Sequence, residues 1–99
     1  MRRNQFTVSA ESVQGNAEAE VTFKALKVRE VREYQETDQT DIELLAEHVV
    51  SWSGFIDDGD KVLPSPADDP EVWDELYLHE RQRLIRLLFQ GPDGESAKN

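Results

Sequence analysis

Apolar and polar residues alternate along the first part of the chain, in two stretches separated by a break. Phe6, Val8 and Ala10 stand at every second position, and the alternation resumes after the break at residues 14–16. The second stretch contains Ala17, Ala19, Val21 and Phe23. Period two with a Gly-Asn break is typical of a β-hairpin with one apolar face. Since an isolated two-stranded ribbon is only marginally stable, this face requires cover from helices or from another chain.

The pattern changes to a helical period after the second stretch. A short stripe over residues 27–34, which contains Val28, Val31 and Tyr34, predicts a first helix. A second helix is predicted from Thr40, which forms a capping box with Glu43 and precedes apolar residues at intervals of three and four. We expect this helix to end near residues 52–54, where Ser-Gly provides a stop.

The last part of the chain contains a turn-rich connection and one more predicted helix. The segment Asp57–Asp60 has turn chemistry, and the prolines at 64 and 66 exclude a continued helix. A third helix is predicted to begin after Asp68 or Asp69, with Pro70 in its first turn, and to stop at Gly91. Whether this helix is interrupted near residues 77–79 is left open.

These elements predict an α+β fold that is mostly helical, with an N-terminal β-hairpin followed by about three helices. We assign residues 1–91 to a single small domain and residues 92–99 to a disordered polar tail. The 99 residues, 37% of them hydrophobic, are sufficient for one modest core. A domain of this size has a stability of a few kcal/mol, not tens.

Acidic residues are concentrated in the middle of the chain. The net charge is −10, and residues 33–80 hold fifteen acidic groups and one basic group. Such a charge argues against direct binding to nucleic acid and favours basic partners. A surface of solvated acidic side chains that serves solubility is the alternative.

The chain carries no sign of secretion or membrane insertion. It has no cysteine, and the basic start leads into an alternating polar segment instead of an apolar leader. No apolar run approaches the length that spans a bilayer. We therefore expect a cytoplasmic protein with no membrane partner.

No catalytic or metal-binding motif emerges from the sequence. The aspartates at 57, 58 and 60 lack the spacing of a calcium loop, and His48 and His79 have no ligand partner at metal-binding spacing. Neither a phosphate-binding glycine loop nor a nucleophile elbow is present. We expect no enzymatic activity, no cofactor and no metal.

The last predicted helix carries a wider apolar face than one packed stripe requires. Part of this face is a candidate surface for a partner, and packing under the hairpin and against the second helix is the alternative. The two tryptophans are either core anchors or residues shared with the partner. The candidate partner-binding residues are Trp52, Trp73, Leu84, Leu87, Leu88 and Phe89.

Taken in order, several segments resemble the tail assembly chaperones of long-tailed, siphovirus-like bacteriophages. They are Val21–Leu26 after the β segment, the helix ending Val49–Trp52, the turn Asp57–Gly59, the exit Val62–Pro64, and a final helix centred on Leu84–Ile85. The resemblance spans residues 20–90. It implies a non-enzymatic protein that binds the tape measure protein, keeps it soluble and assists assembly of tail-tube subunits. It also implies action in the host cytoplasm and absence from the mature virion.

Two other classes remain open at this stage. An acidic mimic of nucleic acid that inhibits a host enzyme would use the acidic excess of residues 33–80. A tail-completion or head-tail connector protein would remain in the virion, unlike a chaperone. Whether the chain forms a homo-oligomer is also left open.

Overall fold

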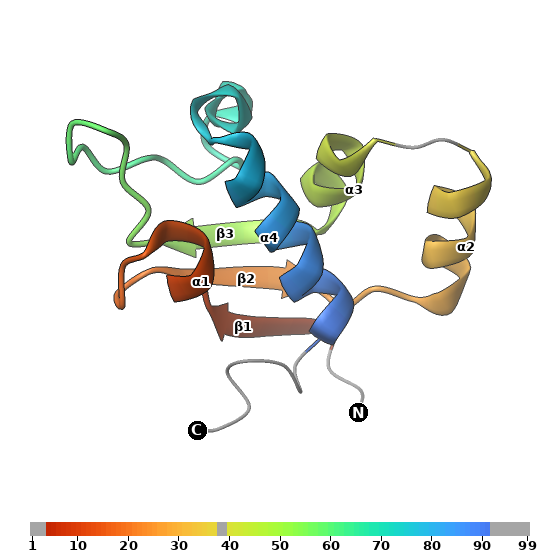
Figure 1. Ribbon diagram of the computed structural model, residues 1–99. Coiled ribbons are helices and arrows are strands. Elements are labelled where there is room, and N and C mark those ends of the chain that lie inside the picture. Colours follow the sequence, from red (N-terminus) through yellow and green to blue (C-terminus); the bar gives the residue numbers. More distant parts are fainter. Residues whose placement is uncertain (1–3, 38–39, 92–99) are drawn as a thin grey trace.

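The computed structural model describes residues 4–37 and 40–91 (Figure 1). Three strands form an antiparallel sheet in the order β1-β2-β3. The strands are β1 (Gln5–Ser9), β2 (Glu20–Lys24) and β3 (Val49–Ser53). The α-helices are α1 (Glu11–Gln14), α2 (Val28–Glu36), α3 (Asp41–His48) and α4 (Leu78–Gln90), and η1 (Pro70–Glu75) is a 3-10 helix.

The helices are distributed unevenly around the sheet. Helix α4 crosses one face of the sheet and packs against α1 and α3 (Figure 1). Helix α2 stands apart from the sheet and has no buried residue. The core between α4 and the sheet contains buried residues from all three strands, from α1, α3, η1 and α4, and from the connections between them; its largest fully buried side chains are Phe23, Phe55, Leu44, Leu45, Leu84 and Leu88.

The fold is α+β, but the expected arrangement of a two-stranded hairpin followed by about three helices is wrong. The second predicted helix ends at His48, and Val49–Ser53 forms a third strand that pairs with β2. The pairing shifts register so that Thr22 faces Ser51 while Phe23 faces Val49. This bulge leaves Val50 as the extra residue, so Val49 and Trp52 both point into the core although they are three positions apart. A spacing of three resembles a helical period, which explains the error.

The hairpin also differs from the expected one. Its two strands pair in antiparallel fashion, as a hairpin requires, with Phe6 opposite Phe23 and Val8 opposite Val21. However, the connection is not a tight turn, because α1 lies between the strands and buries Val13. The polar tail assigned to residues 92–99 lies outside the described residues.

The third predicted helix is divided in two at the break that was left open. Asp69 caps η1 by accepting a hydrogen bond from the Glu71 backbone N–H at 3.1 Å. Helix α4 then begins at Leu78, and the Glu80 carboxylate accepts a hydrogen bond from the Tyr77 backbone N–H at 2.8 Å.

Trp52 fixes the connection after β3 to the core. Its ring stacks on Phe55 with centroids 4.3 Å apart and meets Trp73 edge-on at 5.5 Å. Its indole N–H donates to the Leu63 carbonyl at 3.3 Å. One aromatic cluster thus holds β3, the turn-rich connection and η1 together.

Gly54 provides a test of this packing. Its φ is +75°, and a Cβ there would lie 2.5 Å from the Glu18 carbonyl oxygen, whereas Gly15, with φ +72°, has open space. We expect Gly54→Ala to lower the free energy of unfolding by about 3 kcal/mol, through strain and the clash with backbone. The control Gly15→Ala should cost about 1 kcal/mol. Urea denaturation followed by circular dichroism measures both, and equal losses would contradict the close approach at Gly54.

Candidate functional site

An apolar groove lies where the C-terminal end of α4 meets α2 and the start of the sheet. It has a volume of about 190 Å³. Strand β1, the connection after β2, helix α2 and the end of α4 all contribute to it. The residues that line this apolar groove are Phe6, Ala25, Leu26, Val28, Val31, Leu88, Phe89 and Gly91.

Two large apolar side chains at the groove are exposed to solvent. Val28 is 76% exposed and Phe89 is 45% exposed, whereas Leu88 beside it is 1% exposed. Val28 and Val31 lie one turn apart on α2, so both face the groove. The groove therefore has a buried floor and an exposed apolar rim, as a site for a partner's apolar side chains requires.

Polar contacts attach the first turn of α2 to the end of α3. Glu30 Oε2 lies 3.2 Å from Nε2 of the buried His48, and Glu30 Oε1 accepts a hydrogen bond from the Lys27 backbone N–H at 2.8 Å. Nδ1 of His48 lies 2.9 Å from the Leu44 carbonyl oxygen. Since a carbonyl oxygen only accepts, the contact with Leu44 is a hydrogen bond that Nδ1 donates. One carboxylate thus caps α2 and ties it to α3.

The far end of α2 is attached in a similar way. The Tyr34 hydroxyl donates to Asp41 at the start of α3, and this hydrogen bond raises the pKa of Tyr34. The Tyr34 ring also meets Phe89 edge-on, with centroids 6.1 Å apart. Helix α2 is therefore attached to α3 near both of its ends, while Val28 is exposed and Val31 is half-buried.

The Glu30 contact gives the fold a testable pH dependence. The Lys27 N–H lowers the pKa of Glu30 below the ordinary value of 4.5, and His48 adds to this, although partial burial opposes it. Because the folded pKa lies below the unfolded one, the ionised carboxylate stabilises the fold above about pH 4.5, and this contribution is lost as pH falls.

We expect Glu30→Gln to lower the free energy of unfolding at pH 6, and the difference from the wild type to shrink towards zero at pH 3. Urea denaturation at several pH values within this range measures it. Glu36→Gln, which removes a carboxylate from an exposed position of the same helix, is the control. A difference for Glu30→Gln that stayed constant from pH 6 to pH 3 would contradict the assignment.

The sequence-predicted partner residues lie mostly in the core. Helix α4 needs a wide apolar face because it packs on the sheet and also against α1 and α3. Only Phe89 is exposed, so a partner reaches little of the predicted face in this fold. The buried members are Trp52, Trp73, Leu84, Leu87 and Leu88.

Sequence reasoning missed the remaining residues of the groove. The stripe of Val28 and Val31 was visible, but nothing in the pattern separated a helix packed on the core from one held beside it. Phe6 and Leu26 were assigned to the apolar face of the hairpin or to the first helix. They come together with Phe89 only because β1, α2 and the end of α4 meet in space.

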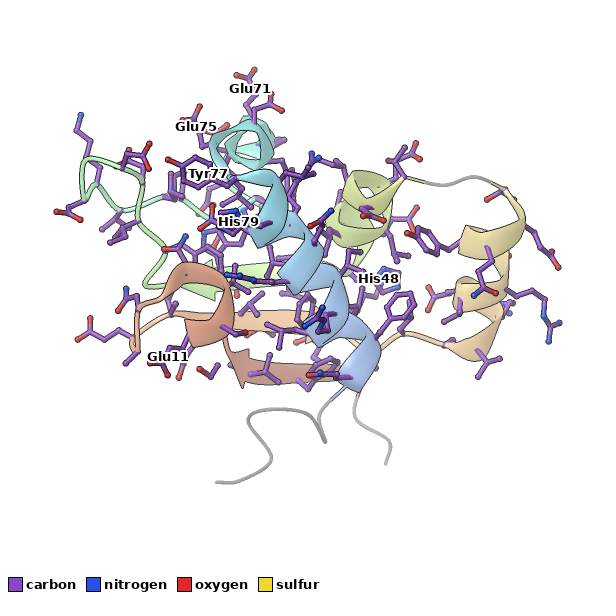
Figure 2. The ribbon with its side chains drawn as sticks, viewed as in Figure 1. Glu11, His48, Glu71, Glu75, Tyr77 and His79 are labelled. Atoms are coloured by element: carbon purple, nitrogen blue, oxygen red, sulfur yellow. The ribbon has the colours of Figure 1, made fainter. Side chains whose placement is uncertain are left out.

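A second feature lies at the opposite end of α4, where acidic side chains surround Tyr77. Figure 2 shows Tyr77, His79, Glu71 and Glu75 at this end of the molecule. The Tyr77 hydroxyl donates to the Asp58 carboxylate at 2.7 Å, which raises the pKa of Tyr77, and its ring stacks on His79 with centroids 5.5 Å apart.

A small pocket of about 180 Å³ lies beside Tyr77. Several polar groups that line it already form hydrogen bonds within the fold. The Gln14 amide donates to Glu80 at 2.8 Å and accepts from the Ile56 backbone N–H at 2.7 Å. Asp57 closes its own turn by accepting from the N–H groups of Gly59 and Lys61 at 2.8 and 3.0 Å. Within residues 4–37 and 40–91, no group of three or more histidine or carboxylate side chains is placed to hold a metal ion.

A larger depression lies between α2 and α3 and is open and acidic. Its volume is about 700 Å³, and Glu33, Glu43 and Glu47 are among its lining residues. Thr37 and Ala46 also line it, so the described part of its lining presents no large apolar side chain. The apolar groove is therefore the stronger candidate for a binding site.

Comparison with known proteins gives no relative from which a function could be transferred. No family model, no curated protein and no solved structure matches the chain. None of the described helices has the length and apolar composition needed to cross a bilayer. Function must therefore be inferred from the groove and from the distribution of charge.

Proposed function

We propose that this protein is a non-enzymatic assembly chaperone that binds an amphipathic segment of its client in the apolar groove. The client that the sequence resemblance implies is the tape measure protein of a phage tail, along which the tail-tube protein assembles. The observation that carries the proposal is the apolar groove, which residues 4–37 and 40–91 leave open, with Val28 and Phe89 exposed at its rim. Such exposed apolar surface on a small, highly charged domain marks a site of protein interaction.

The size of the groove favours a peptide over a small ligand. At about 190 Å³ it lies below the range of roughly 300–1,000 Å³ that is usual for small-molecule pockets. A helix that lays its apolar face into a groove instead inserts a few side chains at spacings of three and four. The net charge of −10 then repels neighbouring complexes from one another and keeps them soluble.

The titratable groups with shifted pKa values serve the fold instead of chemistry. Glu30 caps α2 and contacts His48, Tyr34 donates to Asp41, and Tyr77 donates to Asp58. Each pKa shift has such a structural contact as its largest cause, which for Glu30 is the Lys27 backbone N–H. This supports the assignment to binding proteins over enzymes.

The proposal is tested by co-expression with the protein encoded by the longest tail gene of the same genome. We expect this long client to be soluble and to co-purify with the wild-type chain, and to precipitate without it. Mass spectrometry of mature particles should not find the chain. Its presence there would favour the head-tail connector or tail-completion class, and recovery of a host nuclease or polymerase in place of the client would favour the nucleic-acid mimic.

A further inference from the structure

The charged side chains are divided between the two ends of α4. At the C-terminal end, residues 24–32 hold four basic groups and one acidic group. Lys24, Lys27 and Arg32 are exposed and stand next in sequence to residues that line the apolar groove. Arg86 is exposed one turn before Phe89. The residues next in sequence to the lining of the groove are thus mostly basic, and Glu33 of the same helix lines the depression on the α3 side instead.

The N-terminal end of α4 has the opposite character. Tyr77 and Leu78 are 53% and 61% exposed, and residues 56–80 hold nine acidic groups and one lysine. Glu71 and Glu75 lie at the same end (Figure 2). We call this surface the acidic tip and define it by Tyr77, Leu78, Glu71 and Glu75. It presents a projecting apolar residue within a field of negative charge.

We propose that the acidic tip of one copy of this chain docks into the apolar groove of a second copy. Leu78 supplies the apolar side chain that enters the groove, and the carboxylates around it face the basic residues next to the groove lining. Of the possible contacts between two copies, this one brings unlike charges together, whereas tip-to-tip contact places like charges against each other.

The two surfaces are well separated on the molecule. The tip and the groove lie at opposite ends of a 13-residue helix, which is about 20 Å long. Repeated from copy to copy, the contact produces rings or open chains, and made reciprocally between two antiparallel copies it closes a symmetric dimer.

Self-association also bears on the proposed function, although it does not depend on it. A second copy and the client would occupy the same groove, so each excludes the other. Because the contact is small and the net charge opposes association, self-association is weak and concentration-dependent. A client that binds more tightly displaces the second copy, and without client a second copy covers the groove only at high protein concentration.

Sedimentation of single variants tests the two surfaces. Val28→Asp places a charge in the groove at the first turn of α2, where a carboxylate suits the helix dipole. Leu78→Lys changes the tip. We expect each to weaken association at least about tenfold, as loss of a central contact does. Ala46→Asp and Ala46→Lys make comparable charge changes at an exposed position of α3. Both should associate like the wild type.

A mixture of the two variants gives the decisive result. Val28→Asp keeps an intact tip and Leu78→Lys keeps an intact groove, so together they should form a one-to-one heterodimer and nothing larger. The proposal is overturned if the mixture stays monomeric, if either variant alone associates like the wild type, or if the wild type is monomeric at all concentrations. Leu78→Lys should still solubilise the client, so failure of self-association leaves the chaperone proposal to its own test.

Discussion

Leu88→Asp is expected to unfold the domain. Leu88 is 1% exposed and belongs to the core between α4 and the sheet. Removing its side chain costs about 2–5 kcal/mol, and an unpaired carboxylate in its place adds several more. The free energy of unfolding of a 99-residue domain is roughly 5–15 kcal/mol, so little or none of it remains. Far-UV circular dichroism and urea denaturation measure the loss.

Phe89→Asp is the matched control at the next position. Phe89 is half-exposed, and its edge-on contact with Tyr34 is worth about 0.5–1.5 kcal/mol. This variant should therefore keep its circular dichroism spectrum and lose only a small part of its stability. If Leu88→Asp folded as well as Phe89→Asp, the last helix would present its leucines to a partner, and the placement of α4 on the sheet would be wrong.

Val28→Asp is expected to abolish client capture while leaving the fold intact. Val28 is 76% exposed at the first position of α2, so the change removes little buried surface. It nevertheless places a charge on the groove wall, where an apolar client side chain would have to desolvate it at a cost of several kcal/mol. Co-expression with the client should then give insoluble client and soluble variant.

Ala46→Asp serves as the control for this experiment, because it adds the same charge at an exposed position of α3 outside the apolar groove. It should solubilise the client as the wild type does. Loss of the client with both variants would mean that charge, not the groove, governs capture. Full capture by Val28→Asp would place the client elsewhere on the molecule.

The sequence predicted the helix caps correctly, because a cap depends on one or two residues. The capping box of Thr40 and Glu43 is confirmed, with hydrogen bonds of 2.9 and 3.1 Å, and Asp69 caps the segment at Pro70. In contrast, the third strand was missed because the bulge at Val50 gives Val49 and Trp52 a helical spacing. Whether residues 49–53 form a strand or continue the helix depends on their pairing with β2. That pairing joins residues far apart in the sequence, so the local pattern does not reveal it.

The candidate site could be predicted even less well from the local sequence pattern. An apolar stripe specifies that a helix face will be covered, but not whether the cover is the core or a partner. On α4 the stripe is core, because the sheet, α1 and α3 all lie against it. On α2 Val28 stays exposed, because Glu30 and Tyr34 tie the helix to α3 instead of to the sheet. These contacts join one helix to the next, so the periodicity within either helix does not reveal them.

The position of the bound client is the most direct test of the proposed function. Methyl NMR spectra of the isotope-labelled chain, recorded with and without the client segment, report on Leu26, Val28 and Val31 in the groove. The proposal predicts that these methyl groups shift most, while those of the buried Leu84 and Leu87 change little. Shifts confined to the acidic tip or to the sheet, or no shifts at all with a client that co-purifies, would contradict it.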